Sequence, residues 1–270
     1  MVTNNLLARG GRLGNQMFQY AALVGIKYKN QSNIALTKKQ ESDSALSKIF
    51  DLRECFFLDE EYLAWDTTYH EKVFNFDSDI LNVSGNANVN GYFQNENYFL
   101  HCADIIKKEF SFKKEIQQEC DSFFNEFEKN TTVSIHIRRT DYIHLSSIFE
   151  QLSLDFYKKC ISFFNKKNVK FLIFSDDVEW CKKEFIGDNF IFPDKSPFHD
   201  LCLQSMCDHH IISNSTFSWW AAWLGRNKNK TIFAPKNWFT KSYQATNHYG
   251  GIYLQAYSDN KIIPERWIKV

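Results

Sequence analysis

Two adjacent arginines offer the most distinctive chemistry in this sequence. Arg138 and Arg139 lie in the stretch HIRRTDY, which follows the apolar run TTVSI. Period-two alternation along a strand places His136 and Arg138 on one face, and Asp141 follows three residues later. A guanidinium presents a rigid fork of donors that suits phosphate oxygens. A single arginine paired with Asp141 at a surface turn would need no ligand, but HxRR followed by an aspartate at a strand end favours an anion site.

A second polar segment joins a predicted strand to a predicted helix in ISNSTFSWWAAWLG. The residues concerned are Asn214, Ser215, Thr216, Phe217 and Ser218. Backbone N–H groups at a helix start, together with hydroxyls, offer hydrogen bonds to an anion. Taken alone, these hydroxyls are better explained as helix caps than as ligand contacts. Trp219, Trp220 and Trp223 follow at helical spacing, which predicts core packing rather than contact with a ligand.

A third segment, GGRLGN, is a glycine-rich turn before a predicted helix that starts near Asn15. Glycine permits a tight turn and close approach of the backbone to a ligand. The turn matches neither GxGxxG nor a P-loop, so by itself it is weak evidence of a site. It follows a run, NLLA at 5–8, that reads as a strand, and together they predict a βα unit of nucleotide-binding type.

These residues need elements that hold them. From about residue 130, short β-rich runs alternate with helical segments, which predicts a parallel sheet with crossover helices. The predicted strands are 133–137, 170–174, 189–192, 210–213 and 231–234, and the predicted helices lie near 154–167, 178–185, 198–207 and 217–227. Ligands of such sheets bind outside the carboxyl ends of the strands. Three polar segments follow predicted strands at that edge of the sheet: RRTD, SDD with its Asp176, and SNSTFS.

The predicted fold is therefore α/β, with two Rossmann-like domains and a cleft between them. We place the N-terminal domain at 1–125 and the C-terminal domain at 126–270. No Pro- or Gly-rich linker separates them, and residues 30–90 are too weakly patterned for their elements to be assigned.

Composition limits the partners. Lys plus Arg and Asp plus Glu both total 32, so no global positive field exists to attract nucleic acid or an acidic membrane, and an anion site must be local. The most apolar run, FSWWAAWLG, is far shorter than the ~20 residues that span a bilayer, and the N-terminus lacks the apolar stretch of a signal peptide. We expect a cytoplasmic protein.

The sequence gives little support for a metal. Its seven cysteines are scattered without CxxC, which argues against both a disulfide framework and a zinc site. Cys202, Cys207, His209 and His210 are close in sequence, but they read as a helix followed by a strand. Asp77-Ser78-Asp79 spells DxD within the weakly patterned segment, where a solvated loop is the simpler interpretation.

Eight ordered motifs resemble glycosyltransferase family 11, the α-1,2-fucosyltransferases of the bacterial, membrane-anchor-free kind. They are GRLGNQMFQYA (11–21), GYFQNENYF (91–99), HIRRTDY (136–142), SLDFYKK (153–159), FSDDVEWCKK (174–183), ISNSTFSWWAAWL (212–224), APKNWF (234–239) and PERWI (264–268). The resemblance covers nearly the whole chain. It implies a GT-B architecture and transfer of L-fucose from GDP-β-L-fucose, with inversion, to the 2-hydroxyl of a galactose-terminated glycan. It also implies no cofactor or obligatory metal, and a pathway such as lipopolysaccharide O-antigen synthesis at the inner face of the cytoplasmic membrane, with peripheral contact through a lipid-linked acceptor.

The resemblance also implies roles for individual residues. In the wider set of fucosyltransferases the arginine of HxR holds the donor β-phosphate, which implies that role for Arg138. The predicted catalytic residues are Arg138, Asn15, His136 and Asp141. The predicted donor-binding residues are Arg12, Gly14, Arg139, Asp176, Asp200, Asn214, Ser215, Thr216, Phe217 and Ser218. Asp200 is the nearest match to an aspartate that contacts guanine, since a carboxylate accepts both the N1–H and N2–H of that base.

The general base stays open at this point. Asp141, His144 and Glu150 are candidates near the strand end. Ser146 stands where the α-1,6 enzymes have a glutamate, so that base is not carried over, and 144–151 departs from the usual family wording, which bears on acceptor preference. Two alternatives to fucosyl transfer also stay open: a related GDP-deoxysugar as donor, and a GDP-sugar-binding module that does not transfer.

Overall fold

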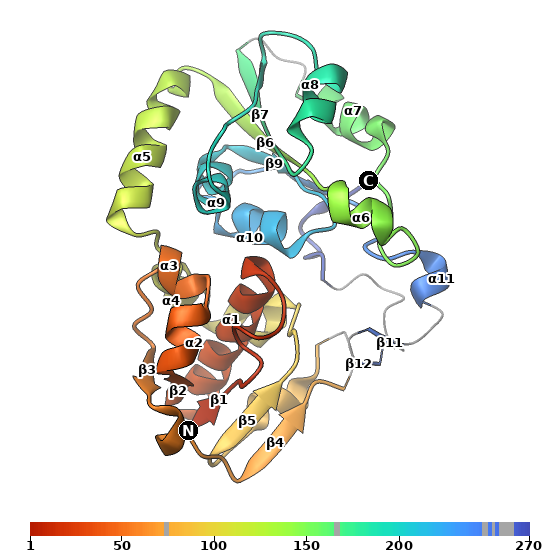
Figure 1. The fold of residues 1–270 in the computed structure, drawn as a ribbon. Helices are drawn as coiled ribbons and strands as arrows, with labels where there is room; N and C mark the ends of the chain where they lie inside the picture. Colours follow the sequence, from red (N-terminus) through yellow and green to blue (C-terminus); the bar gives the residue numbers. More distant parts are fainter. Residues whose placement is uncertain (73–75, 165–167, 245–247, 250–251, 254–261) are drawn as a thin grey trace. The chain divides into compact units, whose positions relative to one another are not determined.

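The computed structural model describes residues 1–72, 76–164, 168–244, 248–249, 252–253 and 262–270 (Figure 1). Among these residues the chain divides into two compact units, Met1–Lys113 with Thr246–Pro264, and Lys114–Ala245 with Glu265–Val270. The sequence placed the boundary after 125, whereas contacts place it at Lys113, because helix α5 (Lys114–Phe124) packs on helix α9 (Pro197–Met206) of the second unit.

The first unit is built on a parallel sheet. Within the described residues it has five strands in the order β3-β2-β1-β5-β4. They are β1 (Val2–Thr3), β2 (Ile34–Thr37), β3 (Cys55–Leu58), β4 (Thr67–His70) and β5 (Ala87–Asn90). The predicted strand at 5–8 is wrong: those residues form turns, and the strand lies earlier, at β1. The Asn4 side chain explains the turn, since its Oδ1 accepts the N–H groups of Leu6 and Leu7.

Helix α1 (Leu13–Asn30) fills the centre of this unit. All residues from Leu13 to Ile26 except Asn15 are buried, so the helix is covered on almost every side. Gly25 is needed for the packing, because a Cβ there would lie within 2 Å of the Tyr98 carbonyl oxygen. The other helices are α2 (Lys38–Asp43), α3 (Leu46–Ile49) and α4 (Ala103–Glu109), with short 3-10 turns at Glu60–Tyr62, Ser78–Asn82, Glu96–Tyr98 and Leu100–Cys102.

The second unit carries a parallel sheet of six described strands in the order β13-β10-β9-β6-β7-β8. They are β6 (Thr131–Ile137), β7 (Val169–Ser175), β8 (Phe190–Ile191), β9 (His209–Ile211), β10 (Ile232–Ala234) and β13 (Ile268–Lys269). Taken in chain order, this is the 3-2-1-4-5-6 arrangement of the Rossmann fold, and the direction of strand addition reverses between β6 and β9. A short antiparallel pair, β11 (His248–Tyr249) and β12 (Ile252–Tyr253), forms a separate ribbon.

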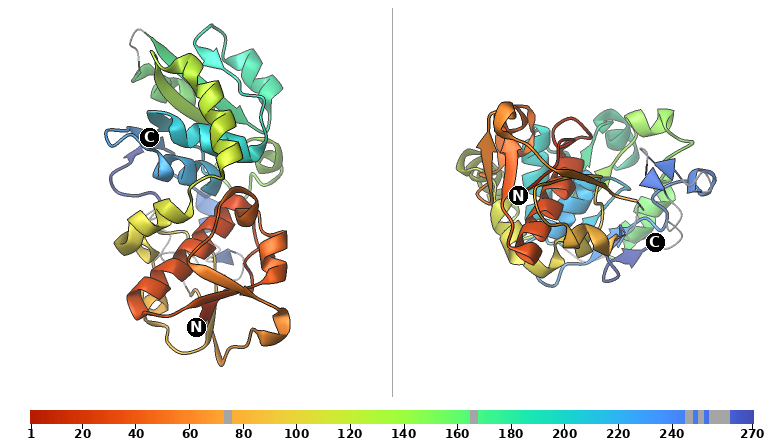
Figure 2. Two further views of the ribbon diagram at one scale, coloured as in Figure 1. Left: turned by 90° about the vertical axis from the view of Figure 1, so that its left-hand side faces the viewer. Right: turned by 90° about the horizontal axis from the view of Figure 1, so that it is seen from below.

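Helices cover both faces of the second sheet (Figures 1 and 2). They are α5, α6 (Thr140–His144), α7 (Leu154–Ser162), α8 (Val178–Glu184), α9, α10 (Thr216–Leu224) and α11 (Lys241–Gln244), with a 3-10 turn at Asn125–Phe127. The strands and helices predicted beyond residue 130 are confirmed. Residues 165–167, at the end of one predicted helix, lie outside the described residues.

The core of the second unit follows the predicted alternation. Val133, Ile135 and Ile137 pack with Tyr157 of α7 and Cys181 of α8 on one face of the sheet. Ser134 and His136 point to the other face, where His210 and Ser213 receive them. Trp219, Trp220 and Trp223 are at most 5% exposed and pack against one another, and Trp219 also contacts Trp267, which confirms the three as core residues.

Candidate active site

The chemically distinctive residues of the second unit meet at one point of its sheet. HIRR lies at the carboxyl end of β6 and SNST at the carboxyl end of β9, and these two strands are neighbours. The strand order reverses between them, and in open α/β sheets such a switch point is the usual place for a ligand. The sheet topology therefore brings these two motifs together at the position where a ligand site is expected.

His136 connects the two loops. Its Nδ1 lies 2.7 Å from Ser213 Oγ, and its ring lies 5.6 Å from that of Phe217 at the start of α10. Burial, aided by the positive charge of Arg138, lowers the pKa of His136 to about 3, so the imidazole is neutral at pH 7. The neutral, buried His136 therefore connects β6 to the loop after β9 through its hydrogen bond with Ser213.

Arg138 is held by two carboxylates. Its Nε lies 2.8 Å from Asp141 Oδ1 and 3.2 Å from Asp176 Oδ2, and an Nη donates to Asp141 Oδ2 at 2.9 Å. The guanidinium carbon also lies 5.8 Å from the ring centroid of Tyr142. Burial opposes the charge, but the hydrogen bond that Arg138 donates to Asp141 and the nearby carboxylates outweigh burial and raise the pKa of Arg138. The guanidinium is therefore charged and fixed in orientation.

Arg139 takes a different environment from its neighbour. Its Nε donates to Asp177 Oδ2 at 3.0 Å, and its guanidinium stacks 3.9 Å above the ring of Trp180 in α8. Asp176 accepts the Arg139 backbone N–H and both the N–H and the hydroxyl of Thr140. Asp176, predicted as donor-binding, thus also fixes the backbone of the RRTD loop.

The residues after β9 divide by role. Asn214 is buried, and its Nδ2 donates to the carbonyls of Glu150 and Trp238 at 2.9 and 2.8 Å. Ser218 Oγ bonds back to the carbonyl of Ser215. Ser215 is the N-cap residue of α10 and makes no side-chain cap. The first turn of a helix is in general a favourable place for an anion, and the anion role of this helix start stays a prediction.

Asp200 lies in the first turn of α9. Its Oδ1 is buried without a hydrogen bond in the described part of the chain. Burial, followed by the charge of Asp194, raises the pKa of Asp200 from 3.8 to about 7. A buried carboxylate oxygen with unused acceptor capacity is the kind of group that a guanine base would satisfy.

The first unit holds the remaining predicted site residues around the start of α1. Arg12 is the exposed N-cap residue, Gly14 is buried, and Asn15 Oδ1 accepts from Gln94 Nε2 at 3.0 Å. Gly11 has φ +82°, which a side chain rarely adopts, and a Cβ there would lie 2.5 Å from Asn15 Nδ2. The turn therefore requires glycine to place Asn15.

Other patterns noted in the sequence have structural roles. Asp77 Oδ1 caps the Ser78–Asn82 turn by accepting the Asp79 N–H, and the described residues contain no cluster of His, Cys, Asp or Glu suited to a metal ion. The thiols of the described cysteines are all unbridged. Within the described chain, no helix combines the length and apolarity that crossing a bilayer would require.

Two parallel-sheet units, one with arginines and a helix start at its switch point, define a glycosyltransferase of the GT-B type. The chain belongs to glycosyl transferase family 11, whose model matches residues 3–257. The family and fold expected from the sequence are thereby confirmed. The assignment of individual residues to catalysis and donor binding, and the cleft between the two units, stay predictions.

Curated relatives span most of the chain. An Escherichia coli O-antigen biosynthesis glycosyltransferase, WbnK, is 28% identical over 85% of this chain and 93% of its own. An alpha-1,2-colitosyltransferase from Escherichia coli is 27% identical over 96% of both. The mouse (Mus musculus) galactoside 2-alpha-L-fucosyltransferase Sec1 is 26% identical over 79% of this chain and 62% of its own. Among solved structures, the fucosyltransferase NodZ from Bradyrhizobium shares the fold, with a TM-score of 0.54 at 14% identity over 82% of this chain and 91% of its own.

Sequence reasoning missed three contacts of the site. It did not foresee that Trp180 and Asp177 hold Arg139, although both stand in the FSDDVEWCKK motif one helical turn apart. It did not foresee that the Asn214 amide donates to two loop carbonyls, and the donor-binding role of Asn214 stays a prediction. It left out Gln94, whose amide bonds to Asn15.

Proposed function

We propose that this family 11 glycosyltransferase moves L-fucose from GDP-β-L-fucose, with inversion, to the 2-hydroxyl of a terminal galactose in a glycan. The single observation that carries the proposal is the charged, oriented guanidinium of Arg138 at the β6–β9 switch point. Departure of GDP leaves negative charge on the β-phosphate, and a fixed guanidinium beside the helix start of α10 stabilises that charge.

Metal independence is part of the proposal. Metal-dependent transferases neutralise the leaving diphosphate with a divalent ion held by carboxylates. Here the carboxylates near the switch point, Asp141, Asp176 and Asp177, are bonded to the two arginines. Arg138 and the N–H groups of α10 then take the electrostatic role of the metal.

A second donor has specific support. One relative that matches 96% of both chains is an alpha-1,2-colitosyltransferase, so a GDP-deoxysugar related to GDP-fucose is the second candidate. The two candidates share the nucleotide, the linkage position and the site residues.

One experiment separates these candidates. The purified protein is incubated with GDP-fucose or GDP-colitose and a panel of β-galactosides in the presence of EDTA, and the linkage of any product is read by NMR. An α-1,2-fucoside formed under chelation supports donor, linkage and metal independence together. Product with GDP-colitose alone moves the assignment to the second donor, and binding of GDP without product from either donor favours a non-catalytic module.

A further inference from the structure

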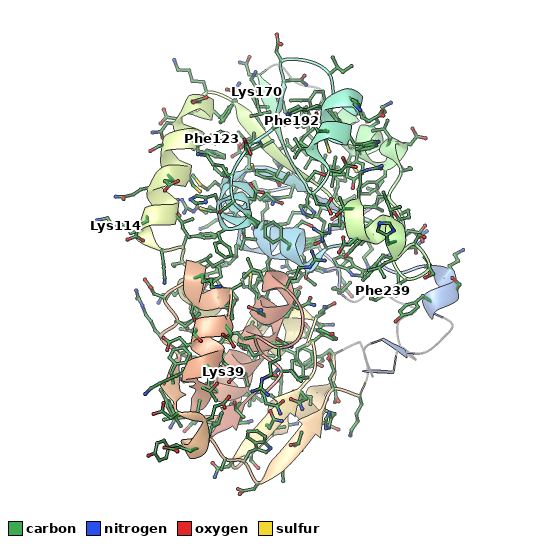
Figure 3. The ribbon with its side chains drawn as sticks, viewed as in Figure 1. Lys39, Lys114, Phe123, Lys170, Phe192 and Phe239 are labelled. Atoms are coloured by element: carbon green, nitrogen blue, oxygen red, sulfur yellow. The ribbon has the colours of Figure 1, made fainter. Side chains whose placement is uncertain are left out.

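The chain that follows α6 is anchored firmly at the site. Phe149 forms an antiparallel bridge with Phe239, and the Thr240 N–H donates to the Ile148 carbonyl at 2.9 Å. The Thr240 hydroxyl also donates to the Ser147 carbonyl at 2.8 Å. Residues 147–150 are therefore paired with the chain that leaves β10, rather than being a loosely held loop. Phe239 is labelled in Figure 3.

Contacts between side chains connect this paired segment to Arg138. The rings of Tyr142 and Phe149 stack with centroids 4.3 Å apart and planes 8° apart, and the Arg138 guanidinium lies over the Tyr142 ring. The Tyr142 hydroxyl donates to the Asn214 carbonyl at 3.0 Å, while the Asn214 amide donates to the Glu150 carbonyl. The Glu150 carbonyl is thus bonded to Asn214, which follows β9. Glu150 also directly follows Phe149, the residue on which Tyr142 stacks.

The structure separates the three candidate bases. Asp141 contacts the Arg138 guanidinium through both carboxylate oxygens, so both are already engaged by a cation. His144 is exposed at the end of a five-residue helix. Glu150 is partly buried, its N–H donates to the Trp238 carbonyl, and its carboxylate has no hydrogen bond or ion pair within the described residues. A carboxylate on a fixed backbone and without a competing cation suits proton abstraction.

We propose that Glu150 is the general base of the transfer reaction. This inference rests on the proposed function. The Glu150 carboxylate takes the proton of the acceptor hydroxyl while the hydroxyl oxygen forms its bond to the anomeric carbon of the donor. The bond from that carbon to the β-phosphate oxygen breaks, and its electron pair leaves with GDP beside Arg138. Glu150 then gives the proton to solvent water.

The test compares Glu150→Gln with Glu150→Asp and with a matched control, Glu126→Gln, an exposed glutamate of the same unit. Glu150→Gln keeps the size of the side chain and removes the base, so kcat falls by about 100- to 10,000-fold, the usual contribution of general base catalysis. The Kd for GDP, measured by calorimetry, stays within about threefold of the wild type. The acidic limb of the kcat pH profile is lost in Glu150→Gln and kept in Glu150→Asp, which retains more activity.

The possible outcomes distinguish a failure of the proposed function from a failure of the general-base inference. Wild-type protein that binds GDP but transfers no deoxysugar contradicts the proposed function itself. Wild-type transfer with near-normal kcat in Glu150→Gln overturns the general-base inference alone. Loss of transfer in His144→Gln, with Glu150→Gln active, assigns the proton to the histidine and likewise overturns the inference. A large loss in Glu126→Gln as well would show that the effect of Glu150→Gln is not specific.

Discussion

Replacing Asp200 with asparagine tests the guanine contact through its pH dependence. The raised pKa of about 7 means that roughly half of the unliganded protein carries the ionised carboxylate at pH 7. The ionised form accepts both guanine N–H groups, whereas the protonated form accepts them poorly. If only the ionised fraction binds, the apparent Kd is the intrinsic Kd divided by that fraction. The fraction falls from about 0.9 at pH 8 to about 0.1 at pH 6, so GDP binding weakens by about tenfold.

Calorimetric titration of GDP at pH 6, 7 and 8 measures this effect in the wild type and in Asp200→Asn. The terminal phosphate of GDP also titrates in this range, and the asparagine variant supplies that contribution by itself. Between pH 6 and pH 8, the Kd for GDP should change by about tenfold more in the wild type than in the variant. Binding in buffers of different ionisation enthalpy should show proton release from the wild type near pH 7. Equal slopes in the two proteins would refute the guanine role of Asp200.

The same carboxyl makes an independent prediction for the stability of the unliganded protein. Its folded pKa of about 7 lies above the ordinary value of 3.8, so between these values the folded state binds the proton more tightly than the unfolded state. The contribution of Asp200 to stability is therefore full below pH 4 and is lost as the pH rises through 7. Asp200→Asn removes this dependence, so its melting temperature should exceed that of the wild type at pH 8 by more than at pH 5.

The remaining predictions concern Arg138, the turn at Gly11 and the hydrogen bonds of the Asn214 amide. Arg138→Ala should raise the barrier to transfer by roughly 2 to 4 kcal/mol, which is the loss of one preorganised donor, and wild-type turnover in this variant would contradict the proposed role. Gly11→Ala should cost about 1 to 2 kcal/mol for its positive φ and more for the contact with Asn15. Gly85 has φ +76° and no atom near its added Cβ, so Gly85→Ala measures the backbone strain without a steric contact. If Gly11→Ala and Gly85→Ala lowered the melting temperature equally, the contact with Asn15 would contribute nothing. Asn214→Asp removes the two N–H donors to the carbonyls of Glu150 and Trp238 and should lower the free energy of unfolding by about 2 to 4 kcal/mol, measured by urea denaturation. An unchanged midpoint would show that these hydrogen bonds do not stabilise the fold.

The second unit was predictable from sequence because its strands are buried and regular. VSIHI and KFLIF are long apolar runs, and their ends carry residues that packing does not explain. The first unit was harder, since β1 has two residues and every residue of β4 is exposed. Such strands show no measurable hydrophobic periodicity in the sequence. The NLLA run looked like a strand by composition, but the buried Asn4 side chain bonds the following N–H groups and turns the chain.

The grouping of the candidate site residues at one edge of the sheet was predictable, but the contacts between them were not. Charged residues at strand ends mark a ligand edge, which follows from topology alone. Which carboxylate meets which guanidinium depends on the turn geometry of loops, and sequence spacing does not report it. Arg138 and Arg139 are adjacent, yet one faces Asp141 and the other stacks on Trp180. For the same reason the hydrogen bonds from the Asn214 amide to the carbonyls of Glu150 and Trp238 could not be predicted from the sequence.

The carboxylates around the arginines determine what a diphosphate must do to bind. Two guanidinium groups face three aspartates, so the cluster of Arg138, Arg139, Asp141, Asp176 and Asp177 carries one net negative charge when all are ionised. That sum does not attract a diphosphate, so binding depends on guanidinium N–H groups that the aspartates do not use. Asp176 also accepts hydrogen bonds from the backbone and the hydroxyl of the RRTD loop. The aspartates thus hold Arg138 charged and oriented before the donor arrives, and the arginine needs little reorganisation when GDP departs.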